Sequence, residues 1–175
     1  MRLGRVRAPM SAAILALGSL VAVAGCATSP ASARGLSGAQ IKALDPDLLP
    51  AHILDLSVDV ENVTKQLHNA QNSYVDALTL FGLRRGSLLI ATFQVSQLTS
   101  LARVSNPAFQ QAFVASIGGT TPVEVRLGGT DVWLTTGTDE QVSIWFSGRD
   151  LLVLSVRNDY GPQRTLIRQL LAVRP

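Results

Sequence analysis

The segment 123–156, VEVRLGGTDVWLTTGTDEQVSIWFSGRDLLVLSV, decides the fold of this chain. It contains four runs of β-branched and aromatic residues: Val123–Leu127, Asp131–Thr136, Gln141–Phe146 and Leu151–Val156. The separators are short and rich in Gly, Ser, Thr and Asp. Because a parallel return needs about a dozen or more residues, they require antiparallel neighbours. The segment predicts a four-stranded meander, whose last strand is apolar on both faces and therefore central.

The sequence before the meander predicts a β-hairpin. Val75–Leu83 and Leu88–Val95 flank Arg84-Arg85-Gly86-Ser87, in which Gly supplies the unusual backbone dihedral of a tight turn. Further upstream, prolines interrupt residues 36–57, which predicts short helical turns and extended pieces. Ser57 or Asp59 is expected to cap a short helix across Val60–Asn69.

Two longer helices are predicted around the meander. The first begins with Asn106 as its N-cap and Pro107 at its first position, and Gly118-Gly119 ends it. Its buried stripe consists of Phe109, Phe113 and Ile117. The second begins near Pro162. Its apolar face consists of Leu166, Ile167, Leu170 and Leu171, with Arg164 and Arg168 on the solvent side.

The predicted order is hairpin, helix, four-stranded meander and C-terminal helix. An antiparallel β-sheet with helices packed on it accounts for each of these apolar stripes, so we expect the α+β class. The order, and phrases such as Ser73-Tyr74-Val75-Asp76-Ala77-Leu78, resemble the PsbP-like α/β/α sandwich of small exported lipoproteins from high-GC Gram-positive bacteria. The resemblance covers about residues 48–175. It supplies no activity and no functional residues.

The N-terminus has the features of an export signal. Arg2, Arg5 and Arg7 precede Met10–Ala24, a charge-free run too short to cross the roughly 30 Å hydrocarbon core of a bilayer. The run ends in Val23-Ala24-Gly25-Cys26, which resembles the bacterial lipobox, and Cys26 is the only cysteine in the chain. The resemblance implies cleavage before Cys26 and a diacylglyceryl anchor on its sulfur, with acyl chains such as palmitate. The other interpretation is an ordinary export signal with a chance cysteine.

The expected organisation is a cleaved signal peptide over 1–25, a lipidated Cys26 with a flexible tether over 26–38, and one domain over 39–175. The first acidic residue is Asp45, and the chain carries a net charge of +3. Removing residues 1–25 leaves twelve basic and twelve acidic residues. We therefore expect no nucleic-acid partner for the exported, neutral chain.

Few residues suit catalysis. The two histidines, His52 and His68, are too far apart in sequence for an HxxxH or HxH metal motif, although acids lie near both. Asp139-Glu140 form an adjacent acidic pair in a predicted loop. No nucleophile elbow, phosphate-binding loop or dinucleotide motif occurs. We expect no enzyme activity, no cofactor and no metal.

A candidate binding surface comprises Trp133, Trp145, Arg84 and Arg85. If Thr136 pairs with Val142, then Trp133 lies opposite Trp145, as a covered core pair or as an exposed aromatic platform. Arg84 and Arg85 stand at the hairpin tip, where they are suited to anionic headgroups or wall polymers, unless they are simply solvated.

The expected function follows from these features. The chain is predicted to be a lipid-anchored protein on the extracytoplasmic side of the cell membrane, acting as a binding or accessory module. An envelope protein or a cell-wall polymer is the expected partner. The alternative is a carrier of an apolar or lipid ligand in a cavity between the sheet and the helices, and an enzyme is a third, weaker hypothesis.

Overall fold

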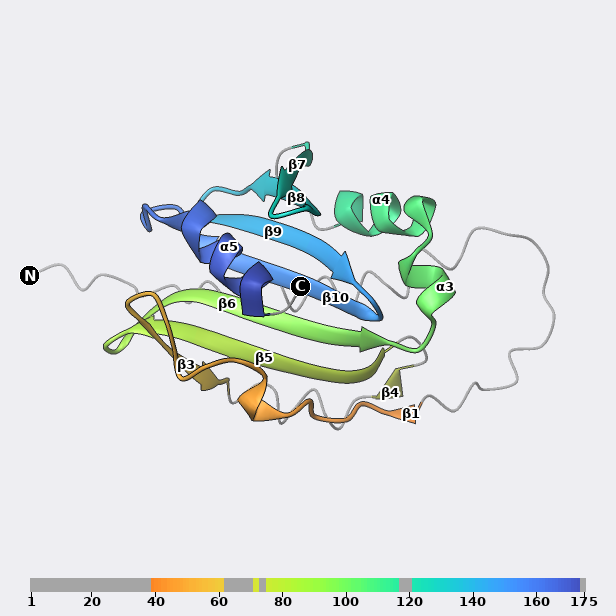
Figure 1. Cartoon of the computed structure of the whole chain (residues 1–175), viewed down its shortest axis with the longest axis horizontal. Coiled ribbons are helices and arrows are strands. Elements are labelled where there is room, and N and C mark those ends of the chain that lie inside the picture. The colour runs from red at the N-terminus through yellow and green to blue at the C-terminus, as the bar shows by residue number, and fades with distance from the viewer. Residues whose placement is uncertain (1–38, 62–70, 73–74, 117–120, 174–175) are drawn as a thin grey trace, which may run out of the picture.

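The computed structural model describes residues 39–61, 71–72, 75–116 and 121–173. Its centre is an eight-stranded antiparallel sheet with the strand order β2-β3-β5-β6-β10-β9-β8-β7 (Figure 1). The bounds are β2 His52–Ile53, β3 Leu56–Val60, β5 Val75–Arg85, β6 Leu88–Leu98, β7 Val123–Leu127, β8 Thr130–Thr136, β9 Glu140–Ser147 and β10 Asp150–Arg157. A separate pair joins β1 Ala39–Gln40 to β4 Gln71–Asn72. The α+β class and the antiparallel sheet are confirmed.

The predicted hairpin is β5 and β6, joined through Gly86, whose φ of 59° needs the conformational freedom of glycine. The predicted meander is β7 to β10. The two parts form one sheet because β10 pairs with β6, from Asp150 opposite Gln97 to Val156 opposite Ala91. Leu151–Val156 are therefore buried in a central strand, as predicted.

Helix α5, Gln163–Val173, covers one face of the sheet and lies across its front in Figure 1. The four predicted apolar residues of this helix, Leu166, Ile167, Leu170 and Leu171, are all buried. They pack on side chains from the sheet, including Phe81, Phe93, Trp145, Leu152 and Leu154, to form the main core. We call this side of the sheet the α5 face.

The opposite side, the α4 face, carries the short helix α3, Leu101–Val104, and α4, Pro107–Ser116. The predicted N-cap is confirmed, because the Asn106 side chain accepts a hydrogen bond from the Ala108 amide at 2.9 Å. Phe113 and Val114 of α4 pack with Ile144 and Val153 of the sheet in a second core. Ile117 and Gly118-Gly119 lie outside the described residues.

One element was predicted wrongly. Ser57 and Asp59 do not cap a helix, because both belong to β3, which pairs with β5 through Ser57 opposite Arg84 and Val60 opposite Phe81. Alternating polar and apolar residues from Leu56 to Val60 suit a strand whose Leu56 and Val58 face the main core. From residue 62 to 70 the predicted helix lies outside the described residues. The 3-10 turn η2, Pro46–Leu48, agrees with the short turns expected there.

Candidate functional site

Four aromatic rings meet on the α4 face: Trp133 of β8, Phe146 of β9, and Phe109 and Phe113 of α4. We call this group the aromatic cluster. The ring centroid of Phe146 lies 5.7 Å from Trp133, 6.2 Å from Phe113 and 6.5 Å from Phe109, each in an edge-to-face arrangement. Phe113 is buried, whereas Trp133, Phe146 and Phe109 are half-buried. The cluster thus joins α4 to the sheet and also presents ring surface to solvent.

The predicted pairing of Trp133 with Trp145 is wrong. Thr136 pairs with Gln141 rather than Val142, which places Trp133 opposite Ile144. The connecting turn contains four residues rather than five and is closed by a 2.8 Å hydrogen bond from the Gly137 amide to the Glu140 carbonyl. Because side chains alternate between faces along a strand, a shift by one residue separates the two tryptophans onto opposite faces of the sheet.

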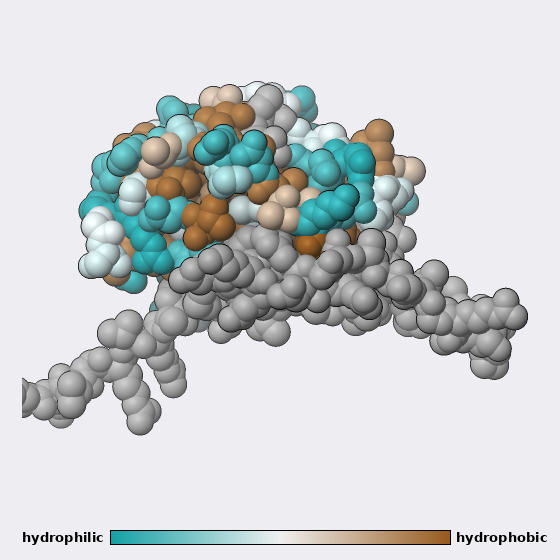
Figure 2. Space-filling view, turned by 90° about the horizontal axis from the view of Figure 1, so that it is seen from below, coloured by the Kyte–Doolittle hydropathy of each residue, from teal (hydrophilic) through white to brown (hydrophobic). Residues whose placement is uncertain are grey.

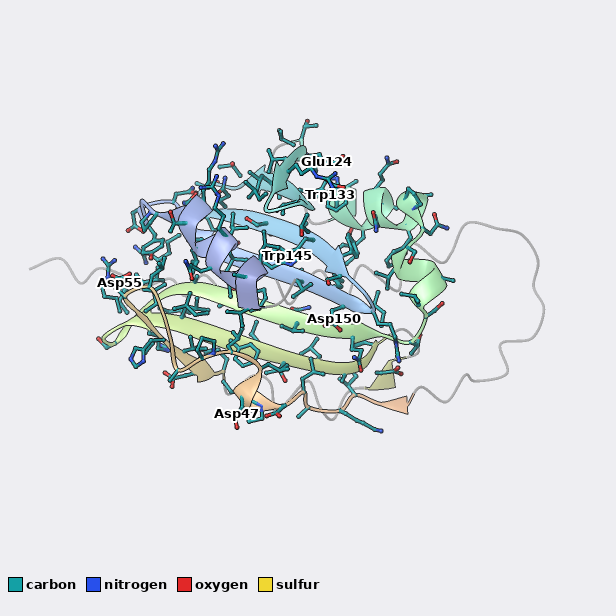
Figure 3. The ribbon with its side chains drawn as sticks, viewed as in Figure 1. Asp47, Asp55, Glu124, Trp133, Trp145 and Asp150 are labelled. Atoms are coloured by element: carbon teal, nitrogen blue, oxygen red, sulfur yellow. The ribbon has the colours of Figure 1, made fainter. Side chains whose placement is uncertain are left out.

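Trp145 is fully buried on the α5 face and stacks on Phe93, with ring centroids 5.5 Å apart and planes 18° apart (Figure 3). It belongs to the main core and is not part of an exposed platform. Its indole Nε1 and the hydroxyl of Ser143 are the two buried side-chain polar atoms, among the described residues, with no hydrogen-bond partner. Sequence patterns cannot reveal such atoms, because their environment comes from β10, β8 and α5.

The two arginines at the hairpin tip are both paired with acids. Arg84 donates to Glu61 at 2.5 Å. The Glu61 carboxylate lies directly against Gly82, because a Cβ atom at residue 82 would be only 2.0 Å from Glu61 Oε1. Arg85 forms an ion pair with Asp55 and lies over the Tyr160 ring, 5.6 Å from its centroid. The predicted basic tip therefore carries compensated charge rather than a free positive patch.

Tyr160 completes the group at this end of the sheet, because its hydroxyl donates to Asp55 Oδ1 at 3.2 Å. Burial, together with this hydrogen bond, raises the pKa of Tyr160 above its usual value. Desolvation acts to raise the pKa of Asp55, but the hydrogen bonds from Arg85 and Tyr160 outweigh it and the pKa is lowered. Asp55 therefore stays ionised at neutral pH, and the group holds the β2–β3 turn to the segment between β10 and α5.

A small hollow lies between β6, β9 and β10, with a volume of about 10 Å³, which is room for one water molecule. Glu140, Ser155, Thr92 and Arg157 supply its polar lining. The Ser155 hydroxyl donates to Glu140, while Arg157 is held by Asp159. This water-sized hollow suits a structural water better than an organic ligand.

Of the histidines and the lipobox residues, only His52 lies in the described part of the chain. His52 is exposed on β2, whereas His68 and the whole of residues 1–38, including Val23, Ala24, Gly25 and Cys26, lie outside the described residues. Within the described part of the chain no three His, Cys, Asp or Glu side chains are grouped to hold a metal ion. The same part contains no helix long and apolar enough to span a membrane.

The exposed large apolar residues of the described chain are dispersed over several elements. They are Leu54, Val60, Leu88, Leu101, Val123 and Val173. On the side shown in Figure 2, hydrophilic and hydrophobic residues are interspersed over the described surface. The aromatic cluster is therefore distinguished by its grouping of four rings, and it is the candidate binding site of this domain.

Comparison of the chain with protein-family models, with curated proteins and with solved structures found no match.

Proposed function

We propose that the protein is a lipid-anchored extracytoplasmic binding module of the cell envelope, held in the outer leaflet through Cys26. The observation that carries the proposal is the position of this single cysteine, directly after Val23-Ala24-Gly25 at the end of a charge-free run. Two acyl chains on one cysteine provide stable anchoring, because each buried methylene contributes about 0.8 kcal/mol. The folded domain then presents its binding surface close to the membrane.

We propose the aromatic cluster as that binding surface, and an envelope protein or a cell-wall polymer as the partner. Partly exposed aromatic rings held rigidly by their neighbours supply contact area at a low cost in side-chain entropy, and they stack well on apolar groups and sugar rings. Trp133 is half-buried and lies opposite Glu124 of the edge strand β7 (Figure 3).

The finer fold relationship also stays a proposal. We propose that the domain is related to PsbP-like α/β/α sandwiches. What supports this is the order of hairpin, helix, meander and helix, with helices on both faces of the sheet.

The carrier hypothesis would place an apolar ligand between α4 and the sheet. The rings of the aromatic cluster contact one another at that position, so we favour the binding module.

Anchoring is tested by replacing Cys26 with Ser in the full chain and labelling cells with a clickable fatty acid. We expect the parent chain to incorporate the label, to partition into the detergent phase and to begin at residue 26. The C26S chain should do none of these. Thr28→Ala, two residues beyond the cysteine, is the matched control and should behave as the parent. Equal labelling of C26S and the parent would refute the anchor.

Binding at the aromatic cluster is tested through tryptophan fluorescence, because the chain has only two tryptophans. In Trp145→Phe the emission comes from Trp133 alone, and we expect acrylamide to quench it. Isolated cell-wall material or solubilised envelope proteins should then reduce this quenching. Trp133→Phe leaves only the buried Trp145 and serves as the control, with weak quenching that added material does not alter. If no envelope fraction protects Trp133, the cluster is not the binding surface.

A further inference from the structure

Strand β7 forms one edge of the eight-stranded sheet, and its far side carries no neighbouring strand in the part of the chain that the structure describes. Glu124 and Arg126 are exposed, and Val123 is 59% exposed, which is the largest exposed fraction among the large apolar residues described. Figure 3 shows Glu124 at this edge of the molecule. An open strand edge is a template for pairing with a further strand.

The register of β7 on β8 determines which backbone groups point outward. The two strands are joined by Gly128-Gly129, whose φ values of 59° and 90° suit a two-residue type I′ turn. Such a turn is flanked by a hydrogen-bonded pair, here Leu127 and Thr130. Hydrogen-bonded and non-hydrogen-bonded pairs alternate, so Val123 and Val125 also bond to β8. Glu124 and Arg126 therefore direct their N–H and C=O groups out of the sheet edge.

These two outward residues carry opposite charges, which makes the edge complementary to itself. When two copies of β7 are set antiparallel with Val125 on the two-fold axis, Glu124 of each copy lies opposite Arg126 of the other. Both residues can then exchange backbone hydrogen bonds in the ordinary antiparallel pattern. Moving the register by two residues in either direction places Glu124 opposite Glu124 or Arg126 opposite Arg126, which is unfavourable.

The apolar side of β7 fits the same arrangement. Val123, Val125 and Leu127 share the α5 face, and Val125 and Leu127 already contact the main core. With Val125 on the axis, the exposed Val123 of one copy lies opposite Leu127 of the other, so the dimer covers the most exposed apolar side chain at this edge. Charges on an edge strand commonly prevent unwanted pairing. Here the alternation of Glu124 and Arg126 instead permits one register of the dimer and disfavours the two neighbouring registers through repulsion between like charges.

We propose that β7 is the interface for a second copy of this chain, giving a two-fold dimer with one continuous sheet across both subunits. The interface is isologous, because the same five residues serve both partners. The proposal goes beyond the binding function above and does not depend on lipidation of Cys26.

The register is tested by introducing one cysteine at a time into the full chain with Cys26 replaced by Ser, purified in detergent, oxidised mildly and analysed without reductant. Val125 lies opposite itself as a non-hydrogen-bonded pair, with Cα atoms about 4.5 Å apart, which suits a disulfide. We expect V125C to form covalent dimers. Val123→Cys is the matched control on the same face, because position 123 lies opposite 127, and it should give only the background of the parent chain. Equal crosslinking at both positions would overturn the proposed register.

The charge pattern is tested by measuring dimer dissociation for three further variants by light scattering. E124R and R126E each convert two attractive pairs across the interface into repulsive ones, and we expect each to weaken the dimer roughly tenfold or more. R126E also removes the 3.2 Å ion pair of Arg126 with Asp131 of β8 within each subunit, so E124R is the cleaner of the two single variants. The double variant E124R/R126E swaps the charges and should restore association. Asp47→Arg, which makes the same charge change as E124R at an exposed site in η2, should leave it unchanged. A monomeric parent chain, or a double variant no better than the singles, would overturn the dimer.

Discussion

Ser143 and Ser96 are both buried serines in central strands, yet their hydroxyl groups have different environments. Ser96 on β6 accepts a hydrogen bond from the Gln94 side chain at 2.9 Å, and both residues are buried. Ser143 on β9 faces the main core without a hydrogen-bond partner. Burying an unpaired hydroxyl costs desolvation free energy that no hydrogen bond offsets. A paired hydroxyl, in contrast, also satisfies the hydrogen-bonding group of its partner.

This difference predicts opposite results for the same substitution. Ser143→Ala removes an unpaired hydroxyl, so we expect the free energy of unfolding to stay the same or to rise slightly. Ser96→Ala leaves the amide of Gln94 unpaired in the interior and should lower the free energy of unfolding by about 1–3 kcal/mol. Urea denaturation of the two variants against the parent measures both. A loss at Ser143 as large as that at Ser96 would mean that its hydroxyl has a partner, such as a buried water.

Among elements, the β2–β3 turn contains the one described non-glycine residue with positive φ. Leu54 has a φ of 56° and is 42% exposed, and the turn is flanked by Ile53 opposite Leu56. Two-residue turns with positive φ at the first position normally place Gly there. A left-handed conformation costs an ordinary residue roughly 1–2 kcal/mol. The group of Asp55, Arg85 and Tyr160 holds this strained turn in place.

Leu54→Gly is therefore expected to leave stability unchanged or to raise it by up to about 1 kcal/mol, because relief of strain outweighs the entropy of glycine in the unfolded chain. Leu88 provides a matched control, since it is 50% exposed at the start of β6 and adopts no positive φ. Leu88→Gly should lower stability by about 0.5–1 kcal/mol. Thermal unfolding of both variants distinguishes them. Equal destabilisation would show that the turn stores no strain at Leu54.

The elements with strong local signals were predicted well, and those without them were not. The Gly86 turn, the Asn106-Pro107 start of α4 and the apolar stripe of α5 each specify a structure within a few residues. Strand β3 has no such signal: its five residues are stabilised by pairing with β5 and by packing on the main core. A local cap at Ser57 or Asp59 cannot compete with that long-range pairing.

At the scale of the whole molecule, the pairing of β6 with β10 joins the hairpin and the meander into one sheet. The turn between β9 and β10 strengthens this junction, because Arg149 donates to the Leu98 carbonyl at 2.9 Å and forms an ion pair with Asp76. Neither contact could be predicted from sequence spacing, since the partners lie far apart along the chain. Two core layers result, one under α5 and one under α4.

The candidate site, too, was predicted only in part. The sequence identified Trp133, Trp145, Arg84 and Arg85 as distinctive residues, but only Trp133 lies in the aromatic cluster. The two tryptophans lie on opposite faces because of strand register. One residue more or less in the turn between β8 and β9 decides which face each side chain occupies. The arginines do not form a free basic patch because tertiary contacts pair them with acids. Glu61, directly after β3, pairs with Arg84, and Asp55 of the β2–β3 turn pairs with Arg85.

The sequence by itself determined the strands of the meander, the hairpin, the helices α4 and α5, and the central position of the last strand, because each depends on periodicity and on turn or cap residues close in the chain. It also placed the export and lipidation signals at the N-terminus, as a prediction. Only the tertiary structure decided the faces of the two tryptophans, the pairing of the arginines and the open edge at β7. These depend on strand register and on contacts between distant segments, whose free energies no local pattern contains.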